Sequence, residues 1–295
     1  MPERDGYLPG VPSWVDTNQP DPDAAATFYG ELFGWETENV MPEGSNSKYY
    51  MARIRGGDVA AISTPPESAP PQATWNTYIA VESADETAAK VQAAGGRVLS
   101  EPFDVFQAGR MAVCADPEGA VFCIWQAGDH KGAQVVNEHG SLNFNGLATR
   151  DVEGAKKFYG AVFGWETLDV SGAFTAWTLP GYGDYLEELT PGNRERMAEV
   201  GAQKGFEDVV AAINPISEDH ANVPAHWAVT FGTDDVDDTA AKAVELGGQI
   251  VVAPLDAPWV RMTVIADPQG ALFAAGQFVP ENRDLVGQGE AATTT

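Results

Sequence analysis

The decapeptide FYGELFGWET, at residues 28–37, returns as FYGAVFGWET at residues 158–167. Eight of the ten residues are identical, and the two copies start 130 residues apart. A second pair supports the repetition, because ADPEGAVF at residues 115–122 matches ADPQGALF at residues 266–273 in six of eight positions. Similarity at a fixed spacing is typical of a structural unit that occurs more than once. The sequence therefore predicts one module present twice.

Each module reads as one strand, one helix and three strands, in that order, and then the same order again. In the first copy, apolar and polar residues alternate over 10–17, which predicts a strand. Asp21 and Pro22 are typical of a helix start, and the helix predicted over 24–32 ends at Gly34. Short strands are expected at 35–40, 48–55 and 59–63. The pattern begins again at Thr74.

The repeat also sets the expected boundaries. We predict a first module at 1–127, a polar linker at 128–140, a second module at 141–280 and a frayed tail at 281–295. The offset between copies grows from 130 at the decapeptide to 152 at Thr87 and Thr239, which is a net insertion of 22 residues in the second module. This insertion, at about 181–224, is either a lid or a strut, and its segments 184–201 and 206–213 have helical character.

Composition indicates a globular protein and excludes several classes. Hydrophobic residues make up 44% of the chain, and no apolar run approaches the length of a membrane span. The first residues lack a signal peptide pattern, and two cysteines cannot form a disulfide framework, so a cytoplasmic location is expected. A net charge of −26 disfavours nucleic acid and favours neutral or cationic ligands, although an acidic surface also serves solubility alone.

The order of motifs resembles the vicinal oxygen chelate superfamily. A capping Asp before a Phe-Tyr-Gly helix, a following Phe-Gly-Trp and a later Asp-Pro-x-Gly-x-x-Phe turn carry the resemblance, which covers almost the whole chain twice. That superfamily includes glyoxalase I, bleomycin resistance proteins and extradiol dioxygenases, and the chain is similar to its tandem two-module actinobacterial type. The resemblance implies an α+β fold in which two βαβββ units per module form a curved mixed-sheet cup. It does not fix the chemistry, because one fold hosts many functions.

Metal-dependent members of that superfamily carry His, Gln or Glu ligands at set places on the cup strands. The resemblance puts these places at Trp14, Asn76 and Cys123 in the first module, and at Phe144, Ala228 and Ala274 in the second. None is an imidazole or a carboxylate. His226 lies two residues from one such place, while His130, His139 and His220 lie in the linker and the insertion. We therefore predict no bound metal and no other cofactor.

Large apolar and aromatic side chains stand where ligands would be expected, which favours a pocket for a flat molecule. For any single residue, ordinary core packing is the alternative. Tyr78 and Trp227 belong to the same group of candidates. The predicted ligand-binding residues are Trp14, Tyr50, Trp75, Asn76, Cys123, Trp125, Phe144, Trp177, Tyr185, His226, Trp259 and Met262.

Candidate catalytic groups are sparse. Asp16 and His226 could act as a base, and Arg110 and Arg261 occupy corresponding places, where they could orient a ligand or pair with surface acids. No nucleophile stands at a recognisable spacing from a base, and no phosphate-binding Gly-rich loop is present. The catalytic residues, if any exist, cannot be assigned from the sequence.

Three functions follow from these observations. The first is a metal-independent binding protein that sequesters an aromatic or amphipathic metabolite or antibiotic, neutral or cationic. The alternative is a metal-independent enzyme, an isomerase or lyase or an accessory to hydroxylation, that acts on a secondary metabolite. The third is a structural or antigenic protein with an incidental pocket. The expected partner is a small molecule, with no nucleic acid and no membrane, and the protein is expected to be a monomer of two modules or a weak homodimer.

Overall fold

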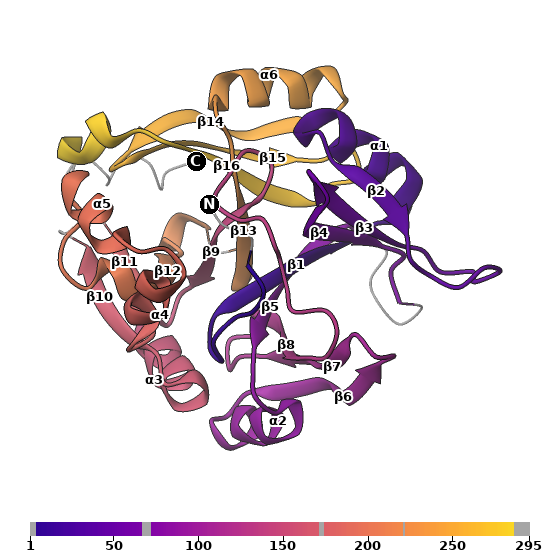
Figure 1. The fold of residues 1–295 in the computed structure, drawn as a ribbon, viewed down its shortest axis with the longest axis horizontal. Coiled ribbons are helices and arrows are strands. Elements are labelled where there is room, and N and C mark those ends of the chain that lie inside the picture. Colours follow the sequence, from indigo (N-terminus) through magenta and orange to yellow (C-terminus); the bar gives the residue numbers. More distant parts are fainter. Residues whose placement is uncertain (1–3, 67–71, 171–173, 221, 286–295) are drawn as a thin grey trace.

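A computed structural model describes residues 4–66, 72–170, 174–220 and 222–285. Two eight-stranded sheets, one from each half of the chain, form the α+β architecture, and each sheet curls into a cup (Figure 1). The order of strands is β2-β3-β4-β1-β5-β8-β7-β6 in the first sheet and β10-β11-β12-β9-β13-β16-β15-β14 in the second. The two orders correspond strand for strand, so the predicted duplication and fold class are confirmed.

The first module consists of eight strands and two helices. Its elements are β1 (Pro12–Asn18), α1 (Pro22–Phe33), β2 (Glu36–Asn39), β3 (Tyr49–Ile54), β4 (Gly57–Ser63), β5 (Thr74–Ala80), α2 (Ala84–Ala93), β6 (Arg97–Val105), β7 (Gly109–Ala115) and β8 (Val121–Ala127).

The second module repeats this order and adds an insertion. Its elements are β9 (Leu142–Thr149), α3 (Val152–Phe163), β10 (Glu166–Val170), β11 (Phe174–Thr178), α4 (Tyr182–Leu189), α5 (Asn193–Glu199), η1 (Phe206–Asp208), β12 (Val209–Pro215), η2 (Glu218–His220), β13 (His226–Gly232), α6 (Val236–Glu245), β14 (Gln249–Ala257), β15 (Val260–Ala266), β16 (Leu272–Phe278) and η3 (Pro280–Leu285).

The helix of the repeated decapeptide begins and ends as its sequence predicts. The Asp21 side chain accepts from the backbone amides of Asp23 and Ala24, and Pro22 occupies the first turn. Gly34 ends α1 in the left-handed conformation at φ 73°, where a residue with a Cβ would be strained. The helix α3 ends in the same way at Gly164, so the same local chemistry shapes both copies.

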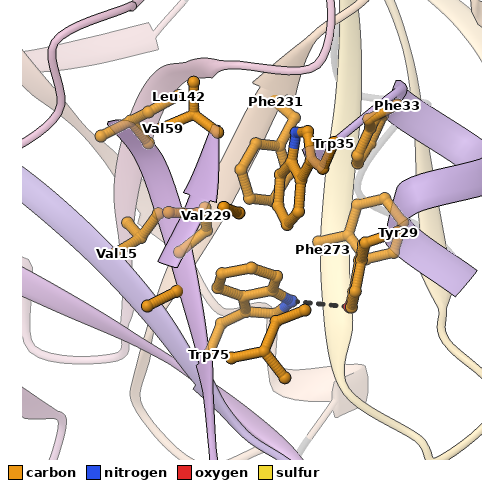
Figure 2. Packing of buried hydrophobic residues seen from close by; sticks show 14 of the residues in the cluster. Val15, Tyr29, Phe33, Trp35, Val59, Trp75, Leu142, Val229, Phe231 and Phe273 are labelled. Atoms are coloured by element: carbon orange, nitrogen blue, oxygen red, sulfur yellow. Dashed lines mark hydrogen bonds between the residues drawn. The ribbon is translucent and has the colours of Figure 1, made fainter. Parts of the chain in front are cut away.

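The helices α1 and α3 pack against their own sheets and also against the other module. The first of two hydrophobic cores joins α1 and the outer side of β1 and β5 to Val229, Phe231 and Phe273 of the second sheet. Figure 2 shows this cluster, with Trp75 facing Tyr29 and Phe231. The second core joins α3 to Phe122 and Ile124 of β8. Because both cores are shared, the modules form one folding unit.

The two repeated motifs meet across this interface. The Tyr29 hydroxyl of the first decapeptide donates to Asp267 in the turn of the second module, at 2.8 Å. In the opposite sense, the Tyr159 hydroxyl of the second decapeptide donates to Asp116 in the turn of the first, at 3.1 Å. The repeated decapeptide therefore serves packing between modules, and its partner is the repeated turn.

The insertion contains α4, α5 and the η1 turn, which the sequence anticipated as helical. The prediction of helical character for 206–213 was wrong, because most of that segment is β12. Its apolar run pairs in parallel with β9, with Ala212 opposite Gly146. Residues 281–285 form most of η3, whereas the rest of the predicted tail lies outside the described residues. None of the helices in the described part of the chain combines the length and apolar character that crossing a bilayer requires.

Candidate functional site

Each sheet has an inner face, turned away from the other module, and an outer face that packs against it. Successive side chains of a strand point to opposite faces. On β1, Val15 pairs with Thr77 of β5, so these two residues share one face and Trp14 and Asp16 belong to the other. On β5, Thr77 donates to Asn145 of the second module, so its neighbours on either side belong to the inner face. The inner faces are the two candidate ligand sites.

The first cup is built around the buried carboxyl group of Asp16, which is 4% exposed. Asn76 donates to it at 2.8 Å, the Tyr78 hydroxyl at 2.7 Å and the Tyr49 hydroxyl at 3.4 Å. The Trp14 indole donates in turn to the Tyr49 hydroxyl at 3.2 Å. These groups bond to one another and form a connected network around the carboxyl group.

Burial dominates the electrostatics of this cluster. Loss of water raises the pKa of Asp16, and the hydrogen bonds from Asn76 and Tyr78 oppose that effect only in part. Burial also raises the pKa of Cys123 well above its usual value. Because the thiolate is the nucleophilic form of cysteine, this shift makes Cys123 a poor nucleophile.

A residue of the linker closes the first cup. The His130 ring lies edge-on to Trp14 with ring centres 4.4 Å apart, and it also contacts Trp125 at 5.9 Å. The Trp125 indole donates to the His130 carbonyl at 3.0 Å. Burial lowers the pKa of His130, and nearby Asp58 opposes this. Trp14, Tyr78 and Trp125 are each less than 10% exposed, so this central part of the first inner face is packed like a core.

The second cup has the same strand register but much smaller side chains. Phe144 lies opposite Thr230 as Trp14 lies opposite Tyr78, and Gly146 lies opposite Ala228 as Asp16 lies opposite Asn76. Ala274 and Gly276 take the places of Cys123 and Trp125. Compared with the first cup, the second therefore has Gly in place of Asp, Ala in place of Asn, Thr in place of Tyr, Ala in place of Cys and Gly in place of Trp.

These substitutions leave the second inner face partly open to solvent. Phe144, Ala228, Thr230, Met262 and Gly276 are all of intermediate exposure. A polar hollow of about 270 Å³ lies beside Gly276, between β16 and the linker. A larger hollow of about 320 Å³ lies elsewhere, on the outer side between α1 and the turn at Pro268. The second inner face is thus the more accessible of the two sites.

The structure brings seven of the predicted ligand-binding residues to the inner faces. Four of them, Trp14, Asn76, Cys123 and Trp125, lie in the first cup, and three, Phe144, His226 and Met262, lie in the second.

The other five predicted residues lie elsewhere. Trp75 and Trp177 sit on the outer faces, where Trp75 donates to the Tyr29 hydroxyl and Trp177 packs on Tyr159. Tyr50 is also directed outward, and its hydroxyl bonds to Asp23 of α1. Tyr185 donates to the Gly6 carbonyl, and Trp259 donates to the Val200 carbonyl from a hairpin turn.

Sequence reasoning missed residues whose importance depends on pairing. Tyr49, not Tyr50, faces Asp16. Gly146 and Gly276 were missed because an absent side chain gives no signal until its partners on neighbouring strands are known. Asn214 lies on β12, the strand that was predicted as helical, at a place opposite Ala148 on the second inner face.

The inner faces do not supply a metal site. The expected ligand places of the second cup hold Phe144, Ala228 and Ala274, which have no donor atoms. In the first cup Trp14 offers no metal ligand and Asn76 already bonds to Asp16, which leaves Cys123 as a single candidate at the expected places. Within the described ranges, no three His, Cys, Asp or Glu side chains are grouped closely enough to hold an ion. The residues present therefore do not fit the metal of the metal-dependent members.

Comparisons with known proteins place this geometry in a family. The model of the Glyoxalase/Bleomycin resistance protein/Dioxygenase superfamily matches residues 13–124 and again residues 141–275. The chain belongs to this superfamily.

Relatives of the same two-module length are found among curated proteins. The chain is 38% identical to "Putative glyoxylase CFP32" of Mycobacterium tuberculosis, over 95% of this chain and 100% of the relative. It is 34% identical to "Anthracycline biosynthesis protein DnrV" of Streptomyces peucetius, over 91% and 93%. Among solved structures, the Mn(II)-bound glyoxalase from Novosphingobium aromaticivorans shares the fold with a TM-score of 0.58 at 18% identity, over 92% and 83%.

Proposed function

We propose that the protein is a metal-independent binding protein of the glyoxalase/bleomycin-resistance superfamily, and that the cup of the second module holds an aromatic or amphipathic small molecule. The observation that carries the proposal is the replacement of large inner-face residues by Gly146, Ala228, Thr230, Ala274 and Gly276 on an unchanged strand register. Small apolar residues form a flat floor, and Phe144 and Met262 can pack against a ring.

Two further facts support a flat, uncharged or cationic ligand. The net charge of −26 repels anions at long range. The names of two Streptomyces relatives assign them to anthracycline biosynthesis, and anthracyclines are flat polycyclic molecules. The ligand would be held by stacking and burial, without chelation, so binding should survive metal removal.

The test is a fluorescence titration of EDTA-treated protein with N-methyl-1,8-naphthalimide, a flat neutral dye, and with an anthracycline. We expect saturable binding that Gly276→Trp abolishes, because this variant places in the second cup the side chain that fills the first. The Cβ of residue 276 would lie 3.3 Å from Thr230, so circular dichroism must confirm folding, and Ala228→Asn serves as a milder filling variant. Binding that needs a stoichiometric metal, or that neither variant weakens, would overturn the proposal.

A metal-independent enzyme is the second candidate, and the position of His226 favours it. Its Nδ1 atom is engaged by the Pro224 carbonyl at 2.8 Å, which leaves Nε2 available as a base on the second inner face. Mass spectrometry of the bound ligand distinguishes the two functions. Unchanged ligand after prolonged incubation supports binding alone, whereas a product whose formation His226→Leu abolishes supports catalysis.

A further inference from the structure

Two polar residues flank one position at the end of the second inner face. Asn214 of β12 and His226 of β13 are both paired with Ala148 of β9, one from each side. Paired residues on neighbouring strands point to the same face, and strands lie about 4.8 Å apart. Their backbones are therefore separated by roughly two strand spacings, about 10 Å, so the two side chains can reach from either side toward one ligand edge over Ala148.

The hydrogen-bonding state of His226 is set by its local contact. The Pro224 carbonyl can only accept, so Nδ1 of the neutral ring carries the hydrogen and donates at 2.8 Å. The other ring nitrogen, Nε2, then presents a lone pair. Among the described residues, no protein group contacts this atom within hydrogen-bonding distance. Nε2 is therefore a hydrogen-bond acceptor that a ligand donor can reach.

Asn214 is exposed at the end of β12, and Gly146 leaves room for its side chain over the floor of the cup. Its Nδ2 atom lies 2.5 Å from the place where a Cβ on residue 146 would be, so the amide lies across Gly146 only because that side chain is absent. The amide has no partner within the part of the chain that the structure describes. Its NH₂ group can donate to a carbonyl on a ligand that rests on this floor.

In the first module, polar side chains at the corresponding end of the inner face bond to each other. Asn18, Ser63 and Thr74 occupy the corresponding places, since Asn18 pairs with Ser63 and Thr74 in the same register. There the Ser63 hydroxyl donates to the Asn18 side chain at 2.9 Å. In the first cup, the polar side chains at this end therefore bond to each other. In the second cup, the His226 acceptor and the Asn214 amide remain available to a ligand.

We propose that His226 and Asn214 recognise the edge of a flat, neutral ligand that carries an N–H or O–H donor beside a carbonyl acceptor. The donor bonds to Nε2 of His226, the carbonyl accepts from the Asn214 amide, and the rings lie on Ala228 and Ala274, beside the glycine that the amide covers. This inference rests on the proposed function and specifies the ligand class for the same site. A ligand without the donor leaves a desolvated Nε2 unpaired. The free energy lost by desolvating an unpaired acceptor is larger than the net free energy gained from a typical hydrogen bond.

The probe pair 1,8-naphthalimide and N-methyl-1,8-naphthalimide tests this directly, because the two share rings and carbonyls and differ in the single N–H. We expect wild-type protein to bind the imide about tenfold more tightly, equivalent to about 1.4 kcal/mol. His226→Leu should abolish the preference, and His226→Gln, which retains an acceptor, should keep part of it. Asn214→Leu should weaken both probes by about fivefold. Thr74→Leu, the matched variant in the first cup, should change neither.

The outcomes separate this inference from the proposed function. The recognition edge, meaning His226 and Asn214, is overturned if wild-type protein shows no preference between the probes or if His226→Leu keeps the preference. The binding function still stands in that case, provided that both probes bind and that Gly276→Trp removes their binding. If neither probe nor an anthracycline binds wild-type protein, both proposals fall. A preference that disappears with His226→Leu and persists with Thr74→Leu supports the recognition edge.

Discussion

The two cups share strand order and register but differ in what fills them. In the first, Trp14, Tyr78 and Trp125 surround a buried carboxyl group and form a closed core. In the second, Phe144, Thr230 and Gly276 take those places and are partly exposed. Duplication thus provides one module whose inner face can serve stability and one whose inner face is free for a ligand.

The largest expected effect is on the stability of the first cup. Trp14→Ala removes a side chain that is 2% exposed together with its bond to Tyr49. We expect a loss of about 3–5 kcal/mol in the free energy of unfolding, measured by urea denaturation. The matched variant Phe144→Ala, at the corresponding and more exposed place, should cost about 1 kcal/mol. Equal losses in the two variants would show that both cups are cores.

The second prediction concerns the pH dependence that Asp16 introduces. Its pKa in the folded protein is raised above 3.8, mainly by burial. Between these two values the folded protein retains a proton that the unfolded chain releases, so the stabilising contribution present at low pH is lost as pH rises. Asp16→Asn lacks this contribution. The stability of wild type relative to the variant should therefore fall with rising pH, by at most about 1.4 kcal/mol per pH unit.

Urea denaturation of both proteins at intervals from pH 4 to pH 8 provides the measurement. The difference between the two proteins isolates Asp16 from the other acidic groups. A difference that stays constant over this range, or that grows in favour of wild type as pH rises, would contradict the buried carboxyl group as described.

The sequence repeat made the fold predictable, whereas the unknown pairing of strands limited the prediction of site residues. The decapeptides, their capping Asp residues and their Gly stops are local signals, so α1 and α3 could be read directly. The apolar segment of β12 carries no such signal, because it becomes a strand only by pairing with β9 across the insertion. Contacts that are distant in sequence decided its structure.

The face of the sheet to which each side chain points could not be predicted for the same reason. Trp75 and Asn76 were both predicted to line the first cup, yet adjacent residues of a strand point to opposite faces. The indole bond from Trp75 to Tyr29 of α1 shows which of the two faces outward. Only the pairing of β1 with β5 shows which residues of β5 face the cup. For the same reason, Gly146 and Gly276 could be recognised as site residues only by comparison with Asp16 and Trp125 at the corresponding positions.

The third prediction uses a residue that both cups share. Met111 and Met262 occupy corresponding places, opposite Trp125 and Gly276. Met262→Ala should weaken N-methyl-1,8-naphthalimide by about fivefold, or about 1 kcal/mol, and change stability little. Met111→Ala should leave that affinity unchanged and cost about 2 kcal/mol of stability, because its side chain contacts a packed core. The assignment of ligand binding to the second cup fails if the two variants behave alike.

The smallest effect concerns the insertion, which joins the two edges of the second cup. Gln203 donates to the Asp169 carbonyl of edge strand β10, and the Trp259 indole donates to the Val200 carbonyl from the β14–β15 hairpin at the other edge. The α5 segment, which directly precedes these contacts in the chain, buries little apolar surface, so it should open more easily than the sheet. Trp259 itself is held at φ 61°, a left-handed conformation that is unusual for an aromatic residue.

Trp259→Phe removes the indole donor and keeps the ring, so we expect amide hydrogen exchange in 193–203 to accelerate about fivefold, the equivalent of a net hydrogen bond of about 1 kcal/mol. Exchange in β1, β5, β9 and β13 should not change. If the segment is a lid, the variant also speeds both association and dissociation of the dye without altering its affinity. If it is a strut, exchange accelerates while both rates stay as in wild type. The rates therefore decide between the two roles, which the position of the segment alone leaves open.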